Sequence, residues 1–364
     1  MEKIKLDVTI IGGGIVGLTV AYQLKKKFPT KDVVLIEGAP FLGDHSTGRN
    51  SGVLHAGLYY KTNSLKHLLC LEGIHLWKKD LCPTLGIEFQ ECGKILFAKN
   101  LNEEEGLHEI WKNAHENGVK GLKWCDSNTL NNISHFVHAQ KAFFSPETGI
   151  LDVTGAVKKI SEAFISIGGM ISKNTKVTSL QKSDGFLLKT NDFEIQSKII
   201  INAAGLESIE IRKQLGLNDL EAVFVKGNYL STSQKIHHPH LFYPVPPKDL
   251  KGLGVHSTID LEGRIKFGPN TEDVFVIDYN DSGMAITTMV PEIMKTFKGI
   301  DQSRLYWDYS GIRSKIKNSK TEKIETDFWI QTPIPGYIEC LGIESPGLSS
   351  APAIAKFIIN QIIF

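Results

Sequence analysis

A glycine-rich turn between a strand and a helix constrains this chain more than any other sequence feature. Gly12, Gly14 and Gly17 have G-x-G-x-x-G spacing. An apolar stretch over residues 8–11 precedes them and a helical pattern over 15–28 follows. In such a unit Gly12 permits the tight turn, Gly14 lets a pyrophosphate approach the backbone, and Gly17 lets helix and strand pack closely. The N-terminus of the helix presents N–H groups and its positive dipole end to the phosphates, so the pattern predicts a dinucleotide-binding site.

An acidic residue after the next strand narrows the choice of dinucleotide. A second apolar stretch over 33–36 ends in Glu37, about twenty residues past Gly17, where an acid accepts hydrogen bonds from the ribose hydroxyls. Its charge repels a 2′-phosphate, which disfavours NADP. The motif lies within a few residues of the start of the sequence, as is common for FAD. We therefore expect FAD, with further contacts from Ile15 and Val16 in the first helical turn.

Charge balance and cysteine content exclude several classes of protein. The 364 residues contain 41 Lys and Arg against 40 Asp and Glu, whereas a general nucleic-acid-binding protein is strongly basic. This length suffices for a large core and about two domains. The five cysteines include no C-x-x-C pair, which disfavours a disulfide framework or zinc site and fits a reducing compartment. We expect no metal and no nucleic-acid partner.

Hydropathy indicates a cytoplasmic location. We find no signal-peptide pattern ahead of the first strand and no apolar run of membrane-spanning length. The final stretch, 353–364, is apolar but short. We interpret it as a core helix; a peripheral contact with the inner face of the cell membrane is the alternative.

Two more glycine-rich sites lie far from the first. A largely apolar stretch over 199–203 runs into Ala204-Gly205, the pattern of a buried parallel strand whose end contacts a ligand. A second such site, 342–350, precedes the final helical pattern. There Ser349 and Ser350 are expected to cap the helix, with Pro352 in its first turn.

Another helical pattern and a series of strands lie between these sites. Residues 289–298 predict a helix with Pro291 in its first turn. Residues 221–275 alternate as strands, with one at 223–225, one at 229–231 and one at 254–258.

Eight segments carry a resemblance to a known family. The strand–GGGIVG–helix unit, IINAAG and the C-terminal glycine turn resemble the FAD-dependent D-amino acid oxidase / glycine oxidase superfamily. Within it the chain resembles the L-2-hydroxyglutarate dehydrogenase (oxidase) family over nearly its whole length. The matching segments are STGRNSGVLHAGLYYKTNSLKHLLC (46–70), CGKILFA (92–98), SPETGILD (145–152), VKGNYL (225–230), YPVPP (243–247), LGVHSTIDLEGRIKFGPN (253–270), DYSGIRSKI (308–316) and ESPGLSSAPAIA (344–355).

The resemblance implies an α/β fold, α+β overall: a Rossmann-like FAD-binding domain with an inserted, mainly antiparallel β-sheet substrate domain. The implied FAD-binding domain is discontinuous and comprises 1–85, 145–220 and 320–364. The implied substrate-binding domain comprises 86–144 and 221–319. The chain departs from the family where Lys226-Gly227-Asn228 replaces an arginine-glycine-aspartate, and where a short Lys-rich stretch follows Arg313.

The resemblance also implies the contacts of the flavin. Residues 47–52 are expected to wrap its phosphate and ring side, Val177 to meet the adenine through its backbone, and the start of the last helix to stabilise negative charge at N1/C2=O after reduction. The expected cofactor residues beyond the first βαβ unit are Thr47, Arg49, Asn50, Ser51, Gly52, Val177, Ala203, Gly205, Gly347, Leu348 and Ser349.

For the substrate, the resemblance places Arg313 on a carboxylate, since a guanidinium offers two parallel donors to its two oxygens. Lys226 is the candidate for a distal carboxylate, and Tyr60 and Tyr243 for the pocket lining. A neutral imidazole suits removal of the hydroxyl proton near pH 7. We favour His256, on a strand, over His55, which follows the flavin loop and could instead pack on the ring or anchor FAD covalently.

The implied activity is oxidation of L-2-hydroxyglutarate, a small dicarboxylate 2-hydroxy acid, to 2-oxoglutarate by hydride transfer from C2 to flavin N5. An amino-acid or amine oxidase of the glycine or sarcosine oxidase type is the alternative, and a catalytic histidine distinguishes the two. A non-catalytic FAD-binding subunit of the tRNA-modification type is disfavoured by the near-neutral charge. Oxygen, a quinone and an electron-transfer protein all remain open as the electron acceptor.

Overall fold

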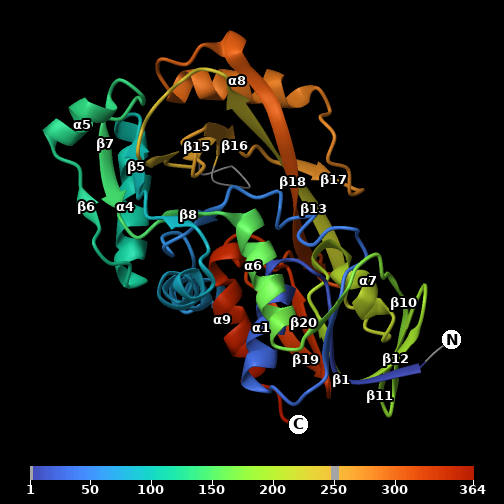
Figure 1. Ribbon diagram of the computed structural model, residues 1–364. Helices are drawn as coiled ribbons and strands as arrows, with labels where there is room; N and C mark the ends of the chain where they lie inside the picture. Colours follow the sequence, from blue (N-terminus) through green and yellow to red (C-terminus); the bar gives the residue numbers. More distant parts are fainter. Residues whose placement is uncertain (1–2, 247–253) are drawn as a thin grey trace.

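The opening strand–helix–strand unit lies in the middle of a large, mostly parallel sheet (Figure 1). The computed structural model describes residues 3–246 and 254–364. In these residues the sheet consists of β10 (Val177–Ser183), β11 (Gly185–Thr190), β12 (Glu194–Asn202), β1 (Lys3–Ile11), β2 (Val33–Ile36) and β9 (Met170–Ser172) in that order, with β20 (Tyr337–Leu341) beside β12 and β19 (Trp329–Ile334) beside β20. β1 pairs in parallel with both β2 and β12. The stretch predicted as a buried parallel strand is therefore the end of β12.

Helices bury their apolar faces beside this sheet. α1, α6 and α9 pack together (Figure 1), and Leu18, Leu24, Ile354 and Ile358 are fully buried between them. Each such side chain contributes about 1.5–3 kcal/mol on burial. The helices of this part are α1 (Ile15–Lys27), α2 (Leu65–Leu76), the π-helical turn Trp77–Leu81, α3 (Cys82–Leu85), α6 (Val153–Ser166), the 3-10 turn Gly205–Glu207, α7 (Ser208–Lys213) and α9 (Gly347–Ile359). The C-terminal apolar stretch thus belongs to a core helix as far as Ile359, whereas residues 360–364 lie outside the helix and Ile363 is exposed.

A second, largely antiparallel sheet forms the other large sheet of the molecule. Its strands in the described residues are β17 (Glu272–Val274), β13 (Leu220–Thr232), β16 (Ile265–Gly268), β15 (His256–Ile259), β14 (Leu241–Pro244), β5 (Lys94–Ala98), β7 (Lys141–Ser145) and β6 (Lys123–Trp124), with β18 (Leu305–Asn318) beside β13. Helices α4 (Leu101–Glu116), α5 (Ser127–Ile133) and α8 (Met284–Thr296), and the 3-10 turn Gln302–Arg304, accompany it. The predicted fold class, a Rossmann-like unit with a mainly antiparallel second sheet, is confirmed.

The structure also has a small three-stranded sheet, whose strands are interspersed along the sequence with those of the two larger sheets. It joins β3 (Val53–Leu54), β8 (Gly149–Leu151) and β4 (Phe89–Gln90). The large sheet draws its strands from 3–36, 170–202 and 329–341, and the antiparallel sheet draws its own from 94–145 and 220–318. The division into a discontinuous FAD-binding domain and a substrate domain follows the same alternation and stays a prediction.

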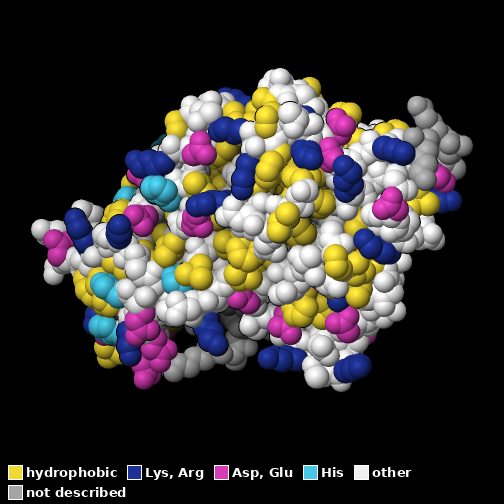
Figure 2. Space-filling view, turned by 90° about the horizontal axis from the view of Figure 1, so that it is seen from below, with side chains coloured by type: hydrophobic (Ala, Val, Ile, Leu, Met, Phe, Trp, Pro, Cys, Tyr) yellow, Lys and Arg dark blue, Asp and Glu magenta, His cyan; other side chains and the backbone are white. Residues whose placement is uncertain are grey.

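One face of the molecule mixes both signs of charge. Figure 2 views the molecule from below the orientation of Figure 1, and cations and acids are interspersed there among small groups of hydrophobic side chains. In the described residues no helix combines the length and hydrophobicity needed to cross a membrane.

Two predictions about the second sheet were wrong. The helix predicted from residue 289 begins at Met284, so Pro291 lies inside α8 rather than in its first turn. The strands predicted at 223–225 and 229–231 are one strand, β13, since Lys226-Gly227-Asn228 continue in extended conformation opposite β18. Part of the segment 253–270 lies outside the described residues, because these resume at Gly254.

The last helix also begins earlier than predicted. Pro346 is its N-cap, so Pro352 lies in the second turn and neither Ser349 nor Ser350 is the cap. Proline has no N–H, which leaves the carbonyl of Leu348, four residues back, without its helical donor. The indole Nε1 of Trp77 donates to that oxygen at 2.9 Å instead. The proline is tolerated because a fully buried tryptophan replaces its missing hydrogen bond.

Candidate functional site

One elongated cavity of about 610 Å³ joins nearly all of the predicted site residues. It extends from the glycine turn after β1 and Glu37 at one end to His256 and Arg313 on the antiparallel sheet at the other. Its volume is within the usual range for sites that bind a small molecule or cofactor, about 300–1,000 Å³. Of the predicted set, Gly17, Gly52 and Lys226 do not line it.

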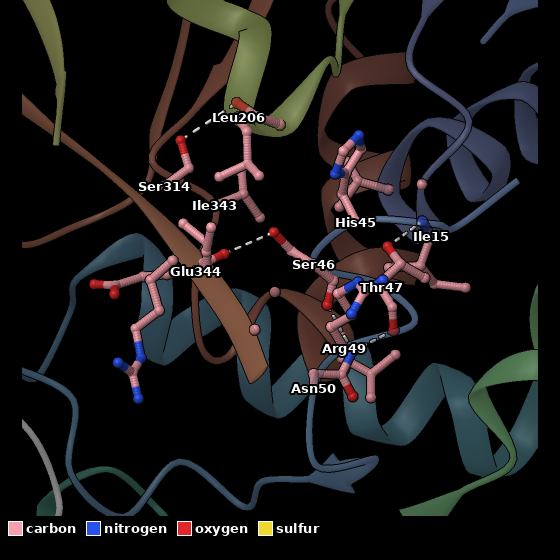
Figure 3. A pocket seen from close by; sticks show the side chains of 18 of the residues that line it. Ile15, His45, Ser46, Thr47, Arg49, Asn50, Leu206, Ser314, Ile343 and Glu344 are labelled. Atoms are coloured by element: carbon pink, nitrogen blue, oxygen red, sulfur yellow. Dashed lines mark hydrogen bonds between the residues drawn. The ribbon is translucent and has the colours of Figure 1, made fainter. Parts of the chain in front are cut away.

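The glycine turn leaves no room for side chains. A Cβ on Gly12, whose φ is +112°, would stand 2.3 Å from the carbonyl oxygen of Ala203. A Cβ on Gly17 would stand 2.0 Å from the carbonyl oxygen of Gly12, so this glycine acts in packing behind the cavity wall. Figure 3 shows Thr47 reaching over the helix start, where its hydroxyl accepts from the backbone N–H of Ile15 at 3.0 Å. The first turn of α1, with Ile15 and Val16, lines the cavity, and a helix N-terminus in this position suits an anion.

Glu37 is fixed at the end of β2 by the backbone around it. Oε2 accepts from the N–H of Gly13 at 2.7 Å and Oε1 from the N–H of Ala39 at 2.8 Å. Each oxygen keeps a second lone pair for a ribose hydroxyl. Val177, at the start of β10, lines the same end of the cavity.

The loop over residues 47–52 is held by its own side chains. The Asn50 amide donates to the carbonyl of Thr47 at 2.7 Å and accepts from the N–H of Gly52 at 2.7 Å. The neighbouring Ser46, labelled in Figure 3, donates to the carbonyl of Ile312 on β18 at 2.9 Å. Gly52, at φ +70°, serves this turn rather than the cavity wall. The loop and Ser46 are therefore held by β18 and by the start of α1.

The start of α9 forms the wall opposite this loop. Gly347, Leu348 and Ser349 line the cavity. The Ser349 hydroxyl accepts from the backbone N–H of His55 at 2.8 Å, which explains why it does not cap the helix. The positive end of α9 therefore faces the same space as His55.

Arg313 is the candidate for binding an anion in the substrate half of the cavity. It lies on β18, and its Nη1 is buried without a hydrogen-bond partner among the described residues. A buried guanidinium nitrogen without an acceptor is costly unless a ligand supplies one. The hydroxyls of Tyr59 and Tyr243 are buried and unpartnered in the same way. These orphaned donors indicate a polar, anionic ligand.

The prediction for Lys226 is wrong. Side chains alternate along a strand, and on β13 it is Val225, Gly227 and Tyr229 that line the cavity. Lys226 lies on the opposite face, is 2% exposed, and donates to the backbone carbonyl of Asn280. In this arrangement Lys226 does not line the cavity.

His256 lies on β15 with its ring against Tyr243. The ring centroids are 3.8 Å apart and nearly parallel, and Nδ1 is 2.9 Å from the carbonyl oxygen of Gly254. A carbonyl only accepts, so Nδ1 carries the proton and Nε2 is the acceptor nitrogen. Burial, with smaller contributions from Lys94 and Arg313, lowers the pKa of His256 to about 3, and the ring is neutral at pH 7.

His55 follows β3 and meets a buried lysine. Its Nδ1 is 3.3 Å from Nζ of Lys94 on β5. Burial first, then the nearby Lys94 and His256, hold the pKa of His55 well below its ordinary value. Burial also lowers the pKa of Lys94 to about 7. Two neutral imidazoles therefore line the substrate half of the cavity, and one titrating amine lies behind them.

Sequence reasoning missed Lys94, Tyr59 and Tyr229. Tyr229 lines the cavity and stacks on Tyr309 at 4.6 Å. Lys94 stands inside the CGKILFA segment, and a lysine within an otherwise apolar strand was the available signal. A second omission is Glu344, which lines the cavity and binds both Lys66 and Lys315 at 2.9 Å.

These features fit FAD. The glycine turn excludes side chains at the phosphate end, Glu37 keeps acceptors for a ribose, and the cavity continues past the flavin loop to the unpartnered Arg313. The expected dinucleotide contacts from Gly12 and Gly14 to Ser349 lie along one continuous space, with Gly17 and Gly52 shaping its walls.

Comparison with known proteins identifies the family. The model of the FAD dependent oxidoreductase (DAO) family matches residues 7–361, and the chain belongs to this family. Mitochondrial L-2-hydroxyglutarate dehydrogenase of Arabidopsis thaliana is 30% identical over 417 residues, covering 100% of this chain and 84% of that protein. L-2-hydroxyglutarate dehydrogenase of Escherichia coli strain K12 is 34% identical over 275 residues, covering 72% of this chain and 63% of that protein.

Solved structures share the fold. L-alpha-glycerophosphate oxidase from Mycoplasma pneumoniae, with FAD bound, superimposes with a TM-score of 0.88 at 24% identity, covering 100% of this chain and 96% of that one. Glycine oxidase from Geobacillus kaustophilus gives 0.82 at 18% identity, covering 99% and 96%. At these identities the likeness concerns the fold alone. The predicted FAD-dependent oxidoreductase class is confirmed by the family match.

Proposed function

We propose that this protein oxidises L-2-hydroxyglutarate to 2-oxoglutarate with FAD as the hydride acceptor. The proposal draws its substrate from the names of the relatives that match most of the chain. Its main structural support is the buried Nη1 of Arg313, which lacks an acceptor in a cavity that also holds two neutral histidines.

Arg313 binds the carboxylate next to the reacting carbon. Two parallel N–H groups fit the two carboxylate oxygens, and burial strengthens the pair. Tyr59 and Tyr243 supply hydroxyl donors from the adjacent wall. These contacts hold C2 in one orientation. The hydrogen on C2 therefore points to the flavin in only one of the two enantiomers.

When bound, FAD accepts the hydride from C2, and the protein has to remove the hydroxyl proton. His55 and His256 are both neutral at pH 7 because burial lowers their pKa values. A neutral imidazole accepts a proton from a hydroxyl within hydrogen-bond reach. Oxidation of an amine needs less help from a base, so this pair of histidines favours a hydroxy acid over glycine or sarcosine.

The reduced flavin then needs an electron acceptor. Oxygen, a quinone and an electron-transfer protein are the candidates, and a peripheral contact with the inner membrane face would suit a quinone. To distinguish them, the enzyme is reduced anaerobically and mixed with each acceptor, and the rate of flavin reoxidation is measured.

Anaerobic bleaching of the flavin absorbance tests the proposal. L-2-Hydroxyglutarate should reduce the flavin faster than lactate, malate, glycine, sarcosine or D-2-hydroxyglutarate. Faster reduction by glycine or sarcosine would favour the amine oxidase alternative, and faster reduction by the D enantiomer would contradict the proposed stereochemistry. Arg313→Met should keep the flavin but slow its reduction by L-2-hydroxyglutarate and lactate alike, because both carry the carboxylate next to the reacting carbon.

A further inference from the structure

A buried lysine behind His55 has no place in the proposed function so far. Lys94 lies on β5, is 0% exposed, and belongs to none of the ion pairs in the described part of the chain. Lys94 Nζ is 3.3 Å from His55 Nδ1 and 4.1 Å from the centre of the Tyr243 ring. A buried amine without a carboxylate is costly in its charged form, which makes a purely structural role expensive.

The titratable groups that interact with Lys94 come from several elements, and all of them are uncharged at neutral pH. They are His55 after β3, Tyr59 in the following loop, Cys70 on α2, Cys92 before β5, Tyr243 on β14 and His256 on β15. Burial raises the pKa of the Cys70 thiol to about 12 and that of Cys92 to about 11, so neither supplies a negative charge.

The inner nitrogens of the two histidines differ in what they can do with a proton. His256 Nδ1 donates to the backbone carbonyl of Gly254, and a carbonyl oxygen accepts this hydrogen bond without becoming protonated. His55 Nδ1 instead meets an amine that can. Only His55 therefore combines a place on the cavity wall with a titratable group directly behind its ring.

We propose that Lys94 is the positioning residue and final proton acceptor behind His55, which makes His55 rather than His256 the general base. The inference rests on the proposed oxidation of a hydroxy acid. As the substrate O–H bond breaks, its proton bonds to His55 Nε2, and the Nδ1 proton of the same ring passes to the neutral amine of Lys94, which becomes an ammonium. The electron pair of the C2–H bond leaves as hydride to the flavin, and C2=O forms.

The relay resolves a difficulty in the site. With its pKa well below the ordinary value, His55 accepts a proton but holds it poorly, and an acceptor with a pKa near the working pH is more efficient. The pKa of Lys94, lowered by burial to about 7, meets this condition. The role assigned from the sequence to His256 changes accordingly: its Nε2 can accept a hydrogen bond from the substrate without keeping the proton.

Stopped-flow reduction of the FAD-loaded enzyme by L-2-hydroxyglutarate between pH 5.5 and 9 tests the relay. The wild-type rate should rise with pH through about 7, because Lys94 has to be neutral to accept. Lys94→Met should be slower by at least about tenfold at pH 8 and should lose this pH dependence. Lys94→Gln, which keeps a polar side chain but cannot titrate, should behave alike. If the rate of flavin reduction in either variant still rose with pH near 7 as in the wild type, the proposal would be overturned.

Lys25→Met is the matched control. Lys25 is 6% exposed, lies at the end of α1, and donates to the carbonyls of Pro29 and Lys31, away from the cavity. It should alter stability but neither the rate nor its pH dependence. If Lys25→Met changed the pH limb as well, the effect of Lys94→Met would be structural.

A second readout does not depend on the substrate. In FAD-loaded enzyme labelled with ¹³C at the lysine Cε, the Lys94 resonance, assigned by its loss in Lys94→Gln, should titrate near pH 7. Titration near the ordinary lysine pKa would leave Lys94 an ammonium at neutral pH and would overturn the relay. If L-2-hydroxyglutarate fails to reduce the flavin while Lys94 titrates near 7, the proposed substrate is wrong and the amine assignment stands.

Discussion

The two ends of the cavity are built in different ways. At the phosphate end the ligand-facing groups are backbone N–H groups and one acid, set by Gly12 and by Glu37 at the ends of neighbouring strands. At the substrate end the ligand-facing groups are side chains: Arg313 on β18, His256 on β15 and His55 after β3. The first end is built mainly by the opening strand–helix–strand unit, with Ala203 packed against Gly12, and the second by strands brought together from across the chain.

Changes at the phosphate end should therefore remove the cofactor, and changes at the substrate end should spare it. Gly12→Val places a branched side chain at φ +112° and against the carbonyl of Ala203, where even a Cβ would be 2.3 Å away. We expect a protein without bound FAD, or an unfolded one, as judged by absorbance at 450 nm and circular dichroism. Normal FAD content in Gly12→Val would contradict the geometry of this end.

Arg313→Lys should leave FAD content unchanged and lower kcat/KM for L-2-hydroxyglutarate. Lysine keeps the charge but loses the two parallel donors, so we expect a loss of about 1.5–3 kcal/mol in transition-state binding, roughly 10- to 150-fold. Steady-state kinetics with flavin quantification measure both quantities together. Unchanged kcat/KM would remove Arg313 from the substrate end.

The same contrast explains how much the sequence could predict. G-x-G-x-x-G and Glu37 are read directly because strand, turn, helix and acid follow one another in the chain. Lys226 was misplaced because which face of β13 looks into the cavity depends on its pairing with β18, and no local pattern encodes that pairing. Ser349 was taken for a cap because its partner, the N–H of His55, is 294 residues away in sequence. Lys94 gave only a weak signal in the sequence, because its lowered pKa results from burial in the folded structure.

The stability of the substrate end should depend on pH through Lys94. Its pKa falls from 10.5 in the unfolded chain to about 7 in the fold, so between these values the unfolded state binds more protons and stability rises with pH. Below pH 7 the cost of burying the charged amine is fully present. Lys94→Met should therefore melt higher than wild type at pH 6, by roughly 2–5 °C, and this difference should shrink towards pH 10. Calorimetry that shows a constant or inverted difference would contradict the buried ammonium.

The smallest effect is expected on the side of β13 that faces away from the cavity. Lys226→Met removes a charge that the sequence suggested for a distal carboxylate, but the side chain is buried and bonds to the carbonyl of Asn280. The replacement keeps the length of the side chain and loses one hydrogen bond, which contributes about 1 kcal/mol to stability. KM for L-2-hydroxyglutarate should change by less than about twofold, the scale expected of a residue that makes no contact with substrate. An increase in KM for L-2-hydroxyglutarate but not for lactate, which lacks the distal carboxylate, would return Lys226 to the substrate site and require the segment around Asn280 to move when substrate binds.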